Sequence, residues 1–360
     1  MTFFLLIVLS FISSNLFAQE IHFFGSLDYA KTTIKKDIDY NNVSHRFGTS
    51  NLTTAGINVS GNIDSNSRVL VQVLHSPIPN KVVIDLVQIQ RNFVNDFTVR
   101  LGQQRLPVFL KSEVIQVKAL YPWLNAPYEV YSQLPMRSFT GGSLEKGFGN
   151  FSAQAYVGET NDSLYQGEAE TKINGKELLG LRLNYEKDDF VAYVHGLKTK
   201  TDITLISPVA ISQGVYGVTK FTEKVKNLEA YTTGLSWNTS KWLTMSEFSY
   251  ITSENEIFKV VKSGYISLGY YLGEKLLLLG TLSNEFARVS SLSPSKTTTY
   301  DMALQYSLDL NTVIKLGASH VDHRLHSVTS TTGTVNGGNG ISADPEGDFD
   351  VFDVQVAFVY

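Results

Sequence analysis

Seven charged residues could sort solutes by charge, and five of them lie within one segment of the chain, residues 105–137. The cations are Arg100, Arg105, Lys111, Arg137 and Arg182, and the anions are Glu113 and Glu129. Opposed cations and carboxylates across a water-filled passage create a transverse field, which orients dipolar solutes and discriminates between ions. The alternative is that each is an ordinary solvated charge. Cations outnumber anions here, which favours a mild preference for anions.

The composition of the same segment is that of an ordered structure. It contains four prolines, Pro107, Pro122, Pro127 and Pro135. Proline restricts its own backbone and that of the residue before it. The run Ala119–Tyr131 is too rich in aromatic residues for a solvated, flexible loop. We therefore expect residues 105–137 to pack against another part of the protein.

The rest of the chain alternates between apolar and polar residues, which predicts β-strands, because successive side chains of a strand point to opposite faces. In Tyr300–Leu308, for example, the apolar residues alternate with Asp301, Gln305 and Ser307. Such two-faced strands suit a wall between lipid and water. Sixteen strands are predicted: Ile21–Tyr29, Thr53–Gly61, Ser67–His75, Val82–Arg91, Phe97–Gln104, Ser138–Glu145, Phe151–Gly158, Glu177–Glu186, Phe190–Lys198, Glu229–Trp237, Trp242–Ile251, Gly264–Leu272, Leu276–Phe286, Tyr300–Leu308, Thr312–Val321 and Phe349–Tyr360.

The connections between these strands alternate in length. Those after even-numbered strands, such as Asp309–Asn311, are short and rich in Gly, Asn and Asp, which accept turn dihedrals. Those after odd-numbered strands are mostly longer and include Ala30–Leu52, Arg105–Arg137, Glu159–Lys176, Thr199–Leu228 and Val321–Asp348. This segregation is typical of a membrane β-barrel, in which closure leaves no unpaired backbone edge in the hydrocarbon. An even strand count places both termini on the short-turn side.

The two ends of the chain indicate export and membrane insertion. Residues 1–18 contain a short apolar run and end in Ala18, which is typical of a secretory signal peptide; an N-terminal membrane anchor is the alternative. Residues 19–360 then form one barrel domain. Residues 352–360 alternate and end on the aromatic Tyr360. This ending resembles the closing strand of Gram-negative outer-membrane β-barrels, and the resemblance implies recognition by the barrel-insertion machinery.

Aromatic residues gather near the predicted strand ends, among them Trp237, Trp242, Phe358 and Tyr360. Amphipathic rings prefer the headgroup level of a bilayer, so we expect a girdle in contact with outer-membrane lipid. The β-propensity of aromatic residues is the simpler alternative.

Composition and motifs exclude several classes of protein. After residue 18 no segment approaches the roughly 18 consecutive apolar residues of a spanning helix, and the mean hydropathy is −0.04. The net charge of −4 argues against nucleic acid as the main partner. We find no Walker loop, dinucleotide fingerprint or zinc-protease helix, and His320–His326 matches no strong metal motif. Neither a metal nor a cofactor is expected, and the chain is not expected to be an enzyme.

The position of the segment 105–137 resembles that of the third loop of general porins, which follows the fifth strand and folds inward. Their Pro-Glu-Phe-Gly-Gly constriction sequence is absent here. The resemblance implies a homotrimer in the Gram-negative outer membrane, with periplasmic termini. We interpret the chain as an all-β, transmembrane antiparallel β-barrel of about 16 strands with an inward-folded constriction loop after strand 5. The expected function is passive diffusion of small hydrophilic solutes and ions. The alternatives are a substrate-specific channel and a barrel enzyme such as a phospholipase.

Overall fold

The computed structural model describes residues 19–33, 48–49, 53–76, 81–134, 136–166, 169–212, 215–254, 260–288, 294–325 and 347–360. The predicted signal peptide, residues 1–18, lies outside the described residues, as do Pro135 and His326. Parts of the predicted long connections Ala30–Leu52 and Val321–Asp348 also lie outside them.

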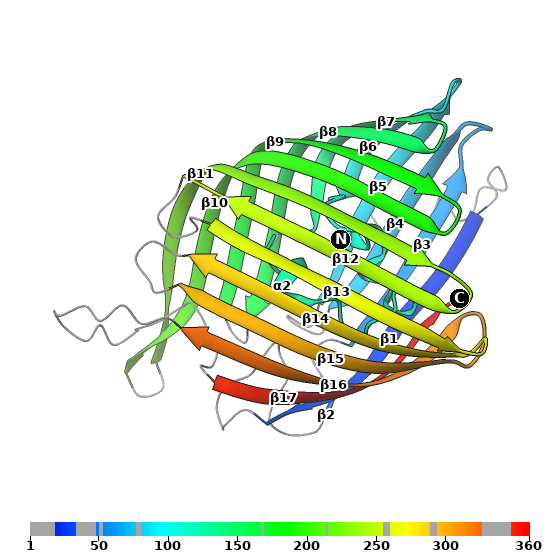
Figure 1. Ribbon diagram of the computed structural model, residues 1–360. Coiled ribbons are helices and arrows are strands. Elements are labelled where there is room, and N and C mark those ends of the chain that lie inside the picture. The colour runs from blue at the N-terminus through cyan, green and yellow to red at the C-terminus, as the bar shows by residue number, and fades with distance from the viewer. Residues whose placement is uncertain are drawn as a thin grey trace.

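The described residues fold into one antiparallel sheet that closes on itself (Figure 1). Its sixteen long strands are β1 (Gln19–Thr32), β3 (Thr54–Asn62), β4 (Ser67–Ser76), β5 (Lys81–Phe93), β6 (Phe97–Arg105), β7 (Ser138–Phe148), β8 (Phe151–Gln166), β9 (Ala169–Lys187), β10 (Phe190–Ser212), β11 (Val215–Asn238), β12 (Trp242–Thr252), β13 (Val260–Leu272), β14 (Leu276–Arg288), β15 (Ser295–Ser307), β16 (Thr312–Leu325) and β17 (Gly347–Val359). The two-residue β2 (Gly48–Thr49) pairs with β1. All sixteen predicted strands are confirmed.

Closure comes from the first and last strands. β1 pairs with β17 from Phe24 opposite Val359 to Thr32 opposite Val351, and every other long strand pairs with its neighbours along the chain. At the start of β1, Gln19 lies opposite Gly61, beside the tight turn between β3 and β4. Tyr360 exchanges backbone hydrogen bonds with Phe23. The start of β1 and the end of β17 therefore lie on the short-turn side of the barrel.

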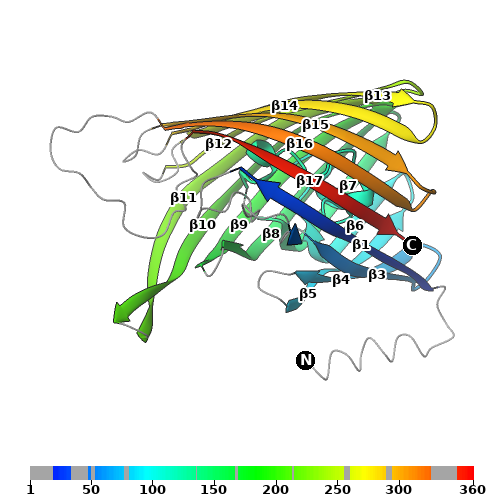
Figure 2. The ribbon, with the colours of Figure 1, turned by 90° about the horizontal axis from the view of Figure 1, so that it is seen from below.

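The prediction of long connections was wrong at two places, Glu159–Lys176 and Thr199–Leu228. Most residues of these segments continue the flanking strands. β8 pairs with β9 as far as Gln166 opposite Ala169, and β10 and β11 reach 23 and 24 residues. These strands are longer than the roughly 9–11 residues that span a membrane, and Figure 2 shows β10 and β11 protruding beyond the other strands. The reason is composition, because β-branched residues favour strands even where charged residues lie among them.

The two faces of the barrel differ in polarity. On β14, Leu278, Leu282 and Phe286 are exposed on the outer face, while Thr281 and Ser283 are buried on the inner face. Other strands repeat this alternation, as the sequence predicts. Among the residues that the structure describes, none of the helices reaches the length and hydropathy needed to cross a membrane.

The segment between β6 and β7 is the only described connection with helices: η1 (Ser112–Val114), η2 (Lys118–Leu120) and α2 (Tyr128–Tyr131). Its apolar side chains, such as Phe109, Trp123 and Val130, belong to the largest buried cluster of the protein. That cluster also contains inner-face residues of the strands, such as Tyr265 and Leu279. The expectation that residues 105–137 are ordered and packed is thus confirmed.

Candidate functional site

The segment that follows β6 begins against the inner face of β9 and β11. Arg182 of β9 donates from Nη1 to the carbonyl oxygens of Pro107 at 2.7 Å and Phe109 at 3.1 Å. Thr232 of β11 donates to the carbonyl oxygen of Val108 at 2.7 Å. Strand side chains therefore bind the segment through its backbone, where prolines and turns leave carbonyls free of secondary-structure partners.

Glu247 of β12 joins the segment to the neighbouring strands, and its carboxylate accepts four hydrogen bonds although the residue is only 2% exposed. Its carboxylate accepts hydrogen bonds from the hydroxyls of Tyr131 at 2.7 Å, Tyr193 at 2.6 Å and Tyr265 at 2.8 Å, and from the backbone N–H of Leu110 at 2.6 Å. Burial, and then the charge of Glu247, raises the pKa of Tyr131 well above its usual range. That hydroxyl therefore keeps its proton and remains a donor.

Lys315 of β16 binds the middle of the segment and is completely buried. Its ammonium group donates to three backbone carbonyls, those of Lys118 at 2.7 Å, Tyr121 at 2.8 Å and Trp123 at 2.6 Å. The same group lies 4.8 Å from the centre of the Tyr121 ring. An ammonium group has three N–H donors, and all three are used to hold one stretch of loop backbone.

A polar network continues from Lys315 to the strands that close the barrel. Lys118 donates to Asp28 of β1 and to Asn125, both at 2.9 Å. Gln355 of β17 donates to Asp28 at 2.5 Å, and Asn125 donates to Asp353 at 3.0 Å. Lys118 and Asp28 form a buried ion pair, as buried charges require, and the network fixes the segment to β1 and β17.

The helical end of the segment contacts β14 and β15. Glu129 accepts hydrogen bonds from Ser283 at 2.6 Å and from Thr299. Gln133 donates to Glu285 at 2.6 Å. Glu129 is 1% exposed, so the structure places this predicted constriction acid against the wall rather than in water.

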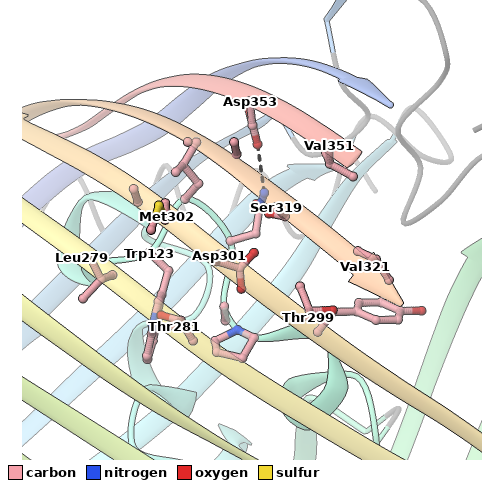
Figure 3. A pocket seen from close by; sticks show the side chains of 18 of the residues that line it. Trp123, Leu279, Thr281, Thr299, Asp301, Met302, Ser319, Val321, Val351 and Asp353 are labelled. Atoms are coloured by element: carbon pink, nitrogen blue, oxygen red, sulfur yellow. Dashed lines mark hydrogen bonds between the residues drawn. The ribbon is translucent and has the colours of Figure 1, made fainter. Parts of the chain in front are cut away.

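A small, mostly apolar pocket remains between residues 123–129 and strands β14–β17 (Figure 3). Its volume is about 80 Å³, and Asp301, Ser319 and Asp353 are among its lining residues. In Figure 3 the dashed line joins Asp353 to the side-chain amide of Asn125. The other carboxylate oxygen of Asp353 has no hydrogen-bond partner in the described part of the chain. The packing of the segment is therefore not complete on this side.

The structure separates the other predicted constriction residues into two groups. Arg100 lies on the inner face of β6 and pairs with Glu145 of β7 at 2.8 Å, with side chains 23% and 31% exposed. Arg105, by contrast, is buried against Asp85 of β5 and donates to Gln72 at 2.8 Å. Arg105 and Arg182 thus hold structure together, and Arg100 has access to water.

Lys111 and Glu113 lie on the segment itself, near η1. Lys111 is half-buried, and burial lowers the pKa of its ammonium group, while the charge of Glu247 opposes that shift. Glu113 is exposed. Arg137, also exposed, lies just before β7, and its backbone N–H donates to Asp162 at 2.6 Å. The predicted site residues that combine charge with access to solvent are Arg100, Lys111, Glu113 and Arg137.

The segment buries part of the barrel wall and leaves another part open. Where it packs, Ser267, Ser283 and Gln355 are completely buried. Elsewhere, Arg68 of β4 pairs with Glu20 of β1 at 2.6 Å, and their side chains are 48% and 63% exposed. Together with Arg100 of β6 and Glu145 of β7, this pair belongs to a wall that water can reach, on which each of the two cations is paired with a carboxylate.

The predicted girdle residues lie beside the short turns. Trp237, Trp242 and Tyr360 are exposed, and Phe358 is half-buried. The ring of Trp242 meets that of Tyr270 edge-on at 4.8 Å. Their contact with lipid stays a prediction.

The histidines of β16 point to opposite faces. His320 bonds to Asp350 at 2.8 Å on the exposed side, whereas His323 is buried and bonds to Thr297. Across the described ranges, no group of three or more His, Cys, Asp or Glu side chains is arranged to hold a metal ion.

Sequence reasoning missed the strongest contacts of the segment, those of Glu247, Lys315 and the Asp28–Lys118 pair. A weak signal was present, because Lys315 and Glu247 are charged residues that alternate with apolar neighbours within predicted strands. Alternation places such residues on the inner face, but it does not reveal which backbone carbonyls or hydroxyls they meet.

The fold of this chain is similar to that of several solved outer-membrane proteins. No family model matches the chain, and no curated protein does. OmpT of Vibrio cholerae, an outer-membrane protein, has a similar solved structure (TM-score 0.62, 11% identity, 97% of this chain and 99% of that chain covered). So does an anion-selective porin from Comamonas acidovorans (TM-score 0.59, 13% identity, 95% and 100% covered). A third is the outer-membrane channel DcaP of Acinetobacter baumannii (TM-score 0.58, 9% identity, 97% and 99% covered). The chain therefore has the closed, sixteen-stranded antiparallel barrel fold that these outer-membrane porins and channels share.

Proposed function

We propose that this protein is an outer-membrane porin through which small hydrophilic solutes and ions diffuse passively. The observation that carries the proposal is the uneven cover of the inner wall. Charged pairs on β1 and β3–β7 remain accessible to water, while the segment after β6 seals the inner face elsewhere. A sixteen-stranded barrel is wide enough for an aqueous lumen, so the accessible wall is one side of the proposed path.

We infer that residues 105–137 lie inside the barrel and narrow this path. Their hydrogen bonds reach Arg182 of β9, Glu247 of β12, Lys315 of β16 and Asp28 of β1. These strands lie far apart around a closed ring, and one segment can contact all of them only from within. On the segment, the exposed Glu113 and the half-buried Lys111 are the charges that could act on a passing solute.

The charge pattern supports passage with little selectivity between ions. Arg100 pairs with Glu145 on the neighbouring strand, and Arg68 pairs with Glu20 across the intervening strand β3. Paired charges keep the local potential small while offering hydrogen-bond donors and acceptors to polar solutes. On the segment, Lys111 and Arg137 outnumber Glu113 by one charge, so any preference between ions should be a mild one for anions.

The setting follows from the same proposal. The apolar outer face contacts lipid of the Gram-negative outer membrane, both termini lie in the periplasm, and the C-terminal strand 352–360 engages the barrel-insertion machinery. A homotrimer is proposed by likeness, since one similar structure is a trimer form of OmpT. On this proposal the protein lets solutes and ions pass through its lumen and is not an enzyme.

Planar-bilayer recording tests the proposal. The purified protein should give stepwise ionic currents, and deletion of Tyr121–Tyr131 should raise the single-channel conductance because the lumen loses part of its filling. A matched control is Lys241→Gln in an exposed turn, which should leave the conductance unchanged. Absence of steps from the intact protein would refute the channel function, and unchanged conductance after the deletion would remove the segment from the path.

A further inference from the structure

Cationic side chains gather on the outer face of β13–β16, at the strand ends farthest from the short turns. They are Lys262, Arg288, Lys296 and Arg324, all exposed, and we call them the outer cationic cluster. Their chain neighbours Val261, Ala287, Thr297 and His323 are buried. Because side chains alternate between faces along a strand, the four cations point away from the lumen.

The register of the sheet brings these cations together. Phe286 of β14 lies opposite Lys262 on one side and opposite Lys296 on the other. Lys296 in turn lies opposite Arg324, and Arg288 follows Phe286 by two residues. With neighbouring strands about 4.8 Å apart, the cluster spans roughly 15 Å. Figure 1 shows β13–β16 side by side in one wall.

Most of this charge has no carboxylate partner among the described residues. Arg324 forms a bidentate pair with Asp322, at 2.7 and 2.8 Å. In the part of the chain that the structure describes, Lys262, Arg288 and Lys296 form no ion pair, and Lys262 lies 5.8 Å from the centre of the Tyr250 ring. Within the described ranges, three of the four outward-facing cations are therefore without a carboxylate partner.

The position of the cluster matches the edge of an apolar band. From Leu278 to Arg288 the outer face of β14 carries exposed Leu278, Leu282 and Phe286. Ten residues at about 3.4 Å each, in a strand tilted by about 40°, rise roughly 26 Å. The apolar band of a membrane barrel is about 25 Å tall. Arg288 therefore lies where hydrocarbon gives way to lipid headgroups.

We propose that the outer cationic cluster binds the phosphate groups of a lipid headgroup, with Phe286 packing against the acyl chains below. Unpaired cations at a lipid boundary are costly unless an anion neutralises them. Phosphate accepts charge-assisted hydrogen bonds from both ammonium and guanidinium groups. The choice of leaflet rests on the proposed function. If the short turns are periplasmic, the cluster lies at the level of the outer leaflet, so the ligand is a phosphorylated lipid of that leaflet.

The test compares the intact protein with the triple variant Lys262→Gln, Arg288→Gln, Lys296→Gln in neutral-detergent micelles. The probe is a glucosamine-based glycolipid carrying phosphate monoesters, and its dephosphorylated form is the reference. Addition of the phosphorylated lipid should raise the unfolding temperature of the intact protein, and the variant should need about tenfold more lipid or more for the same rise. A variant with the same charge change at the short-turn end, Lys187→Gln, Lys241→Gln, Lys275→Gln, should behave like the intact protein.

Equal stabilisation of the intact protein and the cluster variant would overturn the proposal. So would equal stabilisation by inorganic phosphate, because the site would then bind an anion and not a lipid. If the cluster variant does not fold, the single change Lys296→Gln should still weaken the lipid response, and an unchanged response would equally overturn it. Single-channel conductance reports the proposed function separately: a protein that conducts no ions but shows the lipid response refutes only the channel.

Discussion

Replacement of Lys315 by methionine should release the middle of the segment 105–137 while the barrel stays folded. Methionine has the length of lysine without its charge, so the change leaves three buried carbonyls, those of Lys118, Tyr121 and Trp123, without their donor. Each hydrogen bond to a charged group contributes roughly 1.5–3 kcal/mol. The strands keep their own backbone ladders, including the pairing of β16 with β17.

The magnitude follows from what remains after the change. Glu247 and Glu129 still hold the ends of the segment through their hydroxyl and amide partners, and water can reach some of the freed carbonyls. We therefore expect a net loss of about 3 kcal/mol for local opening of residues 118–125, rather than the full sum. A loss of about 3 kcal/mol raises the open population roughly 150-fold.

Two measurements check this prediction. Hydrogen exchange should become faster at backbone amides of residues 118–125, such as that of Leu120, which bonds to Val117 at 2.9 Å. Single-channel currents should be larger and noisier than those of the unchanged protein. The control is Lys275→Met in an exposed turn, and Lys315→Gln, which keeps two donors, should give an intermediate effect. Unaltered exchange and unaltered currents in Lys315→Met would refute the reasoning that this lysine positions the segment.

Two further predictions concern charge in the proposed path. Under a salt gradient, the reversal potential should indicate more cation selectivity in Arg100→Gln and more anion selectivity in Glu145→Gln, because each change leaves the partner of a part-exposed pair uncompensated. The free energy of unfolding should change by less than about 1 kcal/mol. Equal reversal potentials in both variants would exclude the pair from the path. Because burial lowers the pKa of Lys111, this residue should lose its charge as pH rises, at a lower pH than an ordinary lysine. Anion preference should therefore fall as the pH rises, at a lower pH than an ordinary lysine would give. Lys111→Gln should abolish that dependence, and a pH dependence that survives the change would assign it to another group.

Local sequence determined the strands and their pairing because a two-sided wall leaves a period-two pattern. In Val82–Arg91 the apolar residues do not alternate regularly, and the structure gives the reason: the register between β4 and β5 shifts between Gln72 and Val73, opposite Ile84–Leu86. An irregularity of this kind moves the following side chains to the other face. The extended hairpins β8–β9 and β10–β11 were predicted as long connections, although β-branched residues within them favour strands.

Three arginines show how much depends on packing between distant parts of the chain. Arg100 and Arg182 lie within predicted strands, and Arg105 directly follows one. In the fold, Arg182 donates to loop carbonyls, Arg105 is buried against Asp85, and Arg100 keeps access to water. Alternation and turn lengths are local properties, so they predict the barrel and the face on which a strand residue lies. Which of these arginines anchors and which lines the path depends on where a distant segment packs, and that is set by long-range contacts.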